Sequence, residues 1–208
     1  QQFELEQVDS ILIIAMMTRL RQICCEPRML YENYKGESTK FTMCLELIET
    51  LKENGKKVLL FSSFTSIFDS FIEEFNQRGI KYHMITGAVD KKKRKEEVDA
   101  FQSDDSDVFL ISLKAGGTGL NLTKAQAVIH YDPWWNVSAQ NQATDRAYRI
   151  GQTKNVLVYQ LLMKNTIEAK IYEMQKRKKE MSDIFVENSN GGISTLSKEE
   201  LRDLFSME

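Results

Sequence analysis

The chain has 208 residues, of which 42% are apolar and 28% are charged, and 28 Lys and Arg face 30 Asp and Glu. This length supports one large domain with its own core and a smaller appendage. A formal net charge of −2 excludes a free-standing basic protein that coats DNA, so any nucleic-acid contact would be a local patch that salt weakens.

The cysteines and histidines exclude further classes. Cys24, Cys25 and Cys44 form an odd set with two adjacent thiols, which is typical of a reducing, intracellular protein rather than a disulfide framework. His83 and His130 lie in strand-like runs, and without a CxxC or HExxH motif no metal site is expected. No apolar run is long enough to span a bilayer and no secretory signal opens the chain, so no membrane contact is expected.

Two helices are expected before the first strand. Apolar residues at helical spacing over residues 4–25 predict a helix that Pro27 stops. The polar segment 31–39 predicts a linker. A second helical stripe, over residues 41–51, closes at Gly55.

Compact apolar runs then alternate with helical patterns. The runs predict strands at residues 57–63, 81–86, 107–112, 127–131 and 155–162. Strands that alternate with helices of about 10–15 residues predict a doubly wound α/β domain with a mostly parallel sheet and helices on both faces. We expect this domain to cover residues 38–165, after an N-terminal helix and linker over 1–37 and before a C-terminal helical extension over 166–208.

Local signals predict the ends of several helices. Ser66 with Asp69 predicts a capping pair, Asp90 and Ser138 predict N-caps, and Gly79 predicts a C-terminus. In the extension, apolar residues over 167–174 predict an exposed amphipathic helix. Residues 187–192 predict a flexible loop, and Ser197 with Glu200 predicts a capping box for a short last helix.

A glycine-rich segment follows the third predicted strand, where ligands bind in doubly wound sheets. In "SLKAGGTGLNL" (112–122), Gly116, Gly117 and Gly119 allow backbone N–H groups to approach an anion such as phosphate. A flexible loop explains these glycines equally well. The chain contains no GxxxxGK[ST] motif and no acidic pair after a strand, so it lacks the groups that hold a nucleotide triphosphate and its magnesium.

Two more segments carry candidate ligands. In "DPWWN" (132–136), Trp134 and Trp135 either stack on bases or sugars or pack a corner, and composition favours packing. In "QATDRAYRIGQ" (142–152), Gln142, Arg146 and Arg149 lie on one face of a predicted helix. An Asp145–Arg149 surface ion pair would account for the charge, whereas the arginine fork also suits phosphate.

The basic run 91–95 is typical of a solvated first helical turn. Within it, Arg94 shares a face with Val98 and Phe101, so it either supports the fold or contacts a backbone phosphate.

Four ordered segments together resemble the second RecA-like lobe of the Swi/Snf-type ATPases, which belong to superfamily-two helicases. These are "LLFSSFT" (59–65), "ITGAVDKKKRKEEVDAF" (85–101), "LISLKAGGTGLNLTKAQAVIHYDPWWN" (110–136) and "QATDRAYRIGQTKNVLVYQLL" (142–162). The segments 16–27, 166–181 and 196–205 are similar to those that flank this lobe in the family, so the resemblance covers nearly the whole chain. Val137 stands where the family usually has proline, and Tyr148 where it often has histidine.

The resemblance implies a motor whose two lobes enclose ATP and Mg, both held mainly by a first lobe that this chain lacks. Arg146 and Arg149 would be arginine fingers, with Arg149 on the γ-phosphate. The residues implied on the nucleotide side are Gly119, Asn121 and Gln142. Those implied on the DNA side are Ser63, Gly87, Ser112, Lys114, Thr118, Trp134 and Trp135.

The implied partners are the first lobe of the same parental chain, double-stranded DNA and a DNA-bound protein complex. The lobe alone is expected to be monomeric, to bind no cofactor and to be inactive. Its expected location is intracellular, with the bacterial cytoplasm and nucleoid favoured, or the nucleus if the source is eukaryotic. Two alternatives are a non-catalytic DNA- or protein-binding module, and a metabolic α/β enzyme in which Asp132 is the only obvious titratable group at a strand end.

Overall fold

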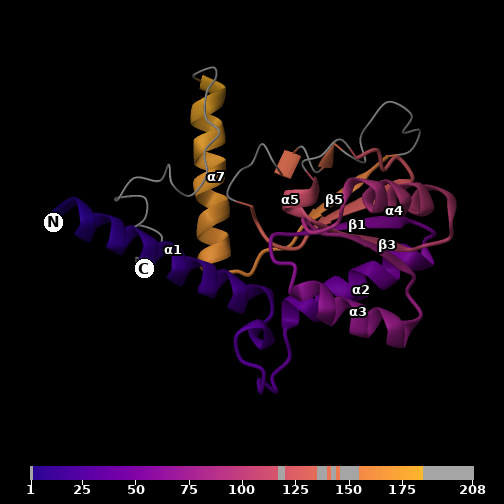
Figure 1. The fold of residues 1–208 in the computed structure, drawn as a ribbon, viewed down its shortest axis with the longest axis horizontal. Coiled ribbons are helices and arrows are strands. Elements are labelled where there is room, and N and C mark those ends of the chain that lie inside the picture. The colour runs from indigo at the N-terminus through magenta and orange to yellow at the C-terminus, as the bar shows by residue number, and fades with distance from the viewer. Residues whose placement is uncertain (1, 117–119, 135–139, 142–143, 146–154, 185–208) are drawn as a thin grey trace.

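The computed structural model describes residues 2–116, 120–134, 140–141, 144–145 and 155–184 (Figure 1). Five strands form one sheet in the order β2-β3-β1-β4-β5, and every neighbouring pair is parallel. They are β1 Lys57–Ser62, β2 Tyr82–Ile85, β3 Val108–Ser112, β4 Ala125–His130 and β5 Leu157–Gln160. The predicted parallel α/β sheet is therefore confirmed, with the carboxyl ends of all five strands at one edge.

Helices cover both faces of this sheet. Helices α2 (Thr39–Glu53) and α3 (Ile67–Arg78) lie on one face, and α4 (Lys91–Ser103) lies on the other (Figure 1). The single-turn helix α5 (Leu113–Gly116) begins directly after β3, at the start of the segment for which the sequence left an anion-binding turn and a flexible loop open.

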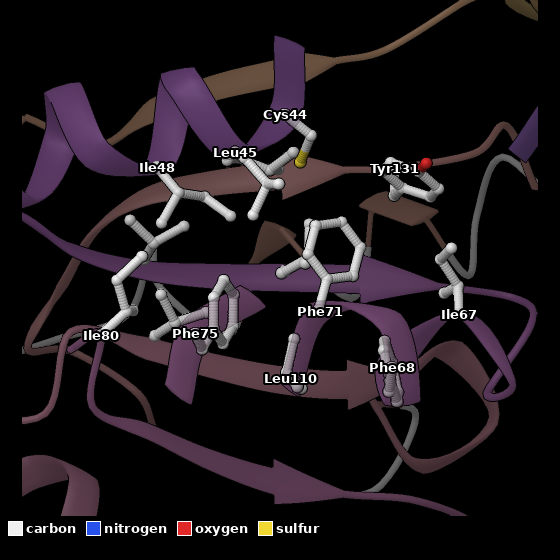
Figure 2. Packing of buried hydrophobic residues seen from close by; sticks show 14 of the residues in the cluster. Cys44, Leu45, Ile48, Ile67, Phe68, Phe71, Phe75, Ile80, Leu110 and Tyr131 are labelled. Atoms are coloured by element: carbon white, nitrogen blue, oxygen red, sulfur yellow. The ribbon is translucent and has the colours of Figure 1, made fainter. Parts of the chain in front are cut away.

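The central strand shows why both faces need cover. Val58 and Leu60 belong to the core on the α2–α3 side, while Leu59 and Phe61 belong to the core on the α4 side. Successive side chains of a strand point to opposite faces, so an unbroken apolar run is buried on both sides. The α2–α3 core is rich in aromatic rings, with Phe71 as its centre (Figure 2).

Two of the predicted helix ends are confirmed. The Asp90 carboxylate accepts hydrogen bonds from the N–H groups of Lys92 and Lys93 at 2.8 and 2.9 Å. Gly79 ends α3 in the left-handed conformation, with φ +61°. The capping pair of Ser66 and Asp69 is wrong, because Ser66 already has helical dihedral angles (φ −63°, ψ −20°) and its side chain makes no capping hydrogen bond.

Helix α1 (Gln2–Cys25), the short helix η1 (Pro27–Met29) and helix α7 (Ile167–Ile184) complete the described elements. Helices α1 and α7 project away from the sheet (Figure 1). They meet in a small apolar cluster of Met17, Ile167 and Ile171. The α7 helix is therefore not the exposed helix that the sequence predicted, because its first turns pack on α1. The predicted N-cap at Ser138, the loop 187–192 and the capping box Ser197–Glu200 lie outside the described residues.

No helix in the described part of the chain is long and apolar enough to cross a membrane.

Candidate functional site

Polar side chains gather at the edge of the sheet where the parallel strands end. Ser62 ends β1 and Ser63 follows it, Ser112 ends β3, and Asp132 follows β4 by two residues. Because β1 lies between β3 and β4, their polar termini lie next to one another. Such an edge is where open α/β sheets bind ligands.

Asp132 is the centre of this edge and is fully buried. Its Oδ1 accepts hydrogen bonds from the Ser62 hydroxyl at 2.7 Å and from the Ser63 N–H at 3.0 Å. The Ser63 hydroxyl contacts the other oxygen, Oδ2. Buried carboxylates are stabilised only when donors surround them, so Asp132 ties the end of β1 to the end of β4.

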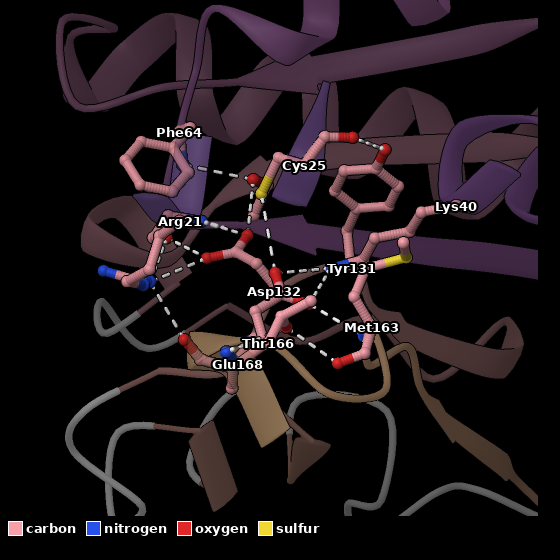
Figure 3. Close-up of polar contacts among 12 residues, drawn as sticks. Arg21, Cys25, Lys40, Phe64, Tyr131, Asp132, Met163, Thr166 and Glu168 are labelled. Atoms are coloured by element: carbon pink, nitrogen blue, oxygen red, sulfur yellow. Dashed lines mark hydrogen bonds and ion pairs between the residues drawn. The ribbon is translucent and has the colours of Figure 1, made fainter. Parts of the chain in front are cut away.

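Arg21 completes the surroundings of Asp132 from a distant part of the chain (Figure 3). Its Nη2 lies 3.0 Å from Asp132 Oδ2, 2.9 Å from Ser63 Oγ and 2.9 Å from the Pro133 carbonyl oxygen. The guanidinium lies over the Phe64 ring, 5.0 Å from its centroid. One α1 side chain thus contacts the segments that follow both β1 and β4.

His130 fixes a second segment to the end of β4. Its Nε2 lies 2.9 Å from Thr144 Oγ1, and the Thr144 hydroxyl donates to the Gln140 carbonyl at 3.3 Å. Since that hydroxyl's proton is used, the geometry assigns the donor role to His130 Nε2–H. Burial lowers the pKa of His130 to about 4, which keeps the ring neutral.

The residues implied on the DNA side have different environments. Gly87 is exposed, with no atom within 4 Å of the position a Cβ would take. Ser63 is half-buried, and its hydroxyl and N–H both bind Asp132. Ser112 is buried, and its hydroxyl accepts the Ala115 N–H at 3.4 Å.

Trp134 is half-buried and packs against the α4-side core. Its carbonyl accepts a hydrogen bond from the Gln175 amide of α7, and its N–H donates to Gln140 at 3.3 Å. These contacts match the packing interpretation that composition favoured. Arg94 also supports the fold, because its Nη2 donates to the Val89 carbonyl at 3.2 Å.

Asn121, implied on the nucleotide side, is exposed, and its carbonyl accepts a hydrogen bond from Gln102 at 3.1 Å. The other implied residues lie outside the described part of the chain; they are Thr118, Gly119, Trp135, Gln142, Arg146 and Arg149, and with them the side chain of Lys114.

No group of three or more His, Cys, Asp or Glu side chains in the described residues could hold a metal ion.

Sequence reasoning missed Arg21, Lys40 and Glu168, which are all buried. Lys40 Nζ contacts both Glu168 oxygens, at 2.6 and 2.7 Å. The signal in the sequence was a charged residue inside an otherwise apolar helical stripe. Such a residue is buried only when it is paired, and the sequence did not identify the partner.

Comparisons with known proteins agree with this architecture. Residues 39–151 match the family model described as the helicase conserved C-terminal domain. An uncharacterized ATP-dependent helicase of Mycoplasma pneumoniae is 40% identical over 207 residues, which are 97% of this chain and 20% of that protein. The SWI/SNF-related matrix-associated actin-dependent regulator of chromatin subfamily A member 1 of Mus musculus is 33% identical over 211 residues, which are 94% of this chain and 20% of that protein. The chain thus spans a fifth of the length of these relatives.

Solved structures give the same result. The Sulfolobus solfataricus SWI2/SNF2 ATPase core in complex with dsDNA superposes with a TM-score of 0.76 at 31% identity, over 96% of this chain and 42% of that one. The C-terminal part of the Fun30 ATPase domain gives a TM-score of 0.68 at 30% identity, over 89% and 59% of the two chains. The chain therefore belongs to the helicase conserved C-terminal domain family and corresponds to the second RecA-like lobe of the Swi/Snf-type ATPases.

Proposed function

We propose that this lobe is one half of the ATPase site of a motor that translocates on double-stranded DNA, and that Arg146 and Arg149 are its arginine fingers. The observation that carries this proposal is the contact of 2.9 Å between His130 Nε2 and Thr144 Oγ1. It holds the segment that leads directly into Arg146 against the carboxyl edge of the sheet. Asp145 N–H donates to the Asn141 carbonyl at 2.9 Å, a helical bond that continues this segment.

Arginine suits this task because its charge cannot be lost and its rigid fork matches phosphate oxygens. Negative charge spreads over the transferring phosphoryl group in the transition state, and a positioned arginine from another unit accelerates the step by about 10³-fold or more. Fingers on a second lobe also make hydrolysis depend on closure of the cleft. On this proposal the isolated chain is inactive, because the first lobe of the parental chain holds the nucleotide and magnesium.

The proposed DNA surface lies at the same edge. Exposed Gly87 after β2 leaves room for a phosphate beside the backbone, and Lys114 would add a positive charge after β3. Ser63 would contact a phosphate by turning its hydroxyl away from Asp132, and Thr118 and Trp135 would continue this surface. Ser112 and Trp134 would support it from the interior, since both are engaged with the protein.

The test uses the full-length protein and its DNA-stimulated ATP hydrolysis at saturating duplex. Arg149→Ala should lower the rate by about 10³-fold and leave duplex binding intact. The matched control is Arg78→Ala, because Arg78 pairs with Glu49 and Glu74 on the surface of α3 and its loss should leave the rate unchanged. A near wild-type rate in Arg149→Ala would remove the finger role.

A further inference from the structure

We propose that Arg21 is a positioning residue for DNA engagement: by keeping the buried Asp132 carboxylate compensated, it frees the Ser63 hydroxyl to pass from Asp132 to a DNA phosphate. This inference rests on the proposed function, which assigns Ser63 to the DNA side. Arg21 itself is only 6% exposed, so it acts through Asp132 and Ser63 rather than by touching DNA.

Ser63 has no donor to spare in the structure. Its N–H is bound to Asp132 Oδ1 at 3.0 Å, and its hydroxyl is bound to Oδ2. A phosphate oxygen accepts hydrogen bonds and donates none, so Ser63 can bind DNA through its hydroxyl only by breaking the contact to Oδ2. Ser63 is half-buried whereas Asp132 is fully buried, so Ser63 is the member of this pair that a ligand can reach.

The effect of this exchange on Asp132 depends on Arg21. With Arg21 present, Oδ2 keeps the guanidinium at 3.0 Å, and Oδ1 keeps the Ser62 hydroxyl and the Ser63 N–H at 2.7 and 3.0 Å. Without Arg21, the departing hydroxyl would leave Oδ2 without these two donors. An uncompensated buried charge is strongly unfavourable, so Ser63 would stay bound to Asp132.

Through Arg21, helix α1 would take part in DNA engagement. Arg21 lies on α1, 42 residues before Ser63 and 111 before Asp132, and it also holds the Pro133 carbonyl at 2.9 Å. A displacement of α1 that moves the Arg21 guanidinium away from the sheet would break all three contacts of Nη2 together. The helix that precedes the lobe would thus control whether the end of β1 can release a donor to DNA.

The test measures the duplex concentration that half-saturates ATP hydrolysis by the full-length protein, at one fixed salt concentration. Arg21→Met keeps an unbranched side chain over Phe64 but removes the charge, and it should raise this concentration about tenfold, the value of one charge-assisted hydrogen bond. The rate at saturating duplex should change by less than about twofold, since the fingers are untouched. Ser63→Ala should raise the half-saturating concentration by a similar factor.

Double variants separate positioning from general destabilisation. Arg21→Met should have no further effect in the Ser63→Ala background, because both changes remove the same contact. Arg21→Met with Asp132→Asn should restore the wild-type concentration, because a neutral amide needs no cation. Lys40→Met with Glu168→Gln is the matched control: it removes a different buried ion pair of the same lobe and should leave DNA half-saturation unchanged.

Three results would overturn the inference. Arg21→Met could have the wild-type half-saturating duplex concentration, or its effect could add to that of Ser63→Ala. The Lys40–Glu168 control could also raise this concentration as much as Arg21→Met does. The proposed function has a separate readout, because Arg149→Ala should lower turnover by about 10³-fold even at saturating duplex. An inactive Arg149→Ala beside a normal Arg21→Met would therefore reject only the role of Arg21.

Discussion

Lys40 on α2 and Glu168 on α7 form an ion pair in which both side chains are buried, with exposed fractions of 3% and 0%. The two residues are 128 positions apart, yet Lys40 Nζ lies 2.6 and 2.7 Å from the two carboxylate oxygens (Figure 3). Glu168 also accepts the Met163 N–H at 3.1 Å. Burial raises the pKa of Glu168, and the positive charge of Lys40 opposes that rise. The pair thus links α2 to α7, and each charge depends on the other for compensation inside the protein.

Removing one partner should therefore destabilise the chain more than removing both. Lys40→Met leaves a buried carboxylate without its cation and should lower the free energy of unfolding by about 3–5 kcal/mol. Adding Glu168→Gln should recover most of this loss, because the neutral amide oxygen still accepts the Met163 N–H. Urea unfolding of both variants measures the two values, and equal stability of the single and double variants would contradict the prediction.

His130 should make the fold sensitive to mild acid. Burial lowers its pKa to about 4, while a histidine of the unfolded chain titrates near 6.5. Between these values the unfolded chain binds the extra proton, so stability is complete above about pH 6.5 and falls as the pH drops towards 4. The loss between pH 7 and pH 5 should be about 2 kcal/mol.

The control for this pH dependence is His130→Gln, which keeps an N–H for Thr144 and does not titrate in this range. Urea unfolding at pH 7 and pH 5 should show a smaller acid loss in the variant by about 2 kcal/mol. Identical pH dependence in the two proteins would show that His130 is not the group responsible.

Gly79 and Gly87 offer a matched pair for backbone conformation. Both have open space where a Cβ would stand, but only Gly79 has a positive φ, of +61°. Gly79→Ala should lower the free energy of unfolding by about 1 kcal/mol, because L-residues avoid the left-handed region. Gly87→Ala should leave stability unchanged and report only on DNA binding. Thermal unfolding compares the two, and equal melting temperatures would exclude the conformational effect.

Much of the lobe was predictable because its signals are local. The five apolar runs predicted five strands, and Asp90 and Gly79 predicted two helix ends, since capping bonds and backbone angles depend on residues a few positions apart. The predicted capping pair at Ser66 was wrong for a local reason as well, because Ser66 already adopts helical backbone angles. The roles of Arg146 and Arg149 remain predictions, because they lie outside the described residues.

Helix α1 marks the limit of such reasoning. Its apolar stripe was recognised, yet Leu12 and Met16 are 59% and 47% exposed, while Met17, Arg21 and Cys25 are buried one turn after another. Hydrophobic periodicity favours the most apolar face of a helix. The face that packs in this chain instead carries an arginine, because a carboxylate 111 residues away lies opposite it.

The sequence by itself determined the kind of fold, the positions of its five strands along the chain and the family, because apolar runs, caps and motif spacing are properties of neighbouring residues. Only the tertiary structure decided what Asp132 does and which face of α1 is buried. The reason is energetic: a buried charge is tolerated only beside its partner, and Arg21 and Asp132 become neighbours only when α1 packs against the carboxyl edge of the sheet.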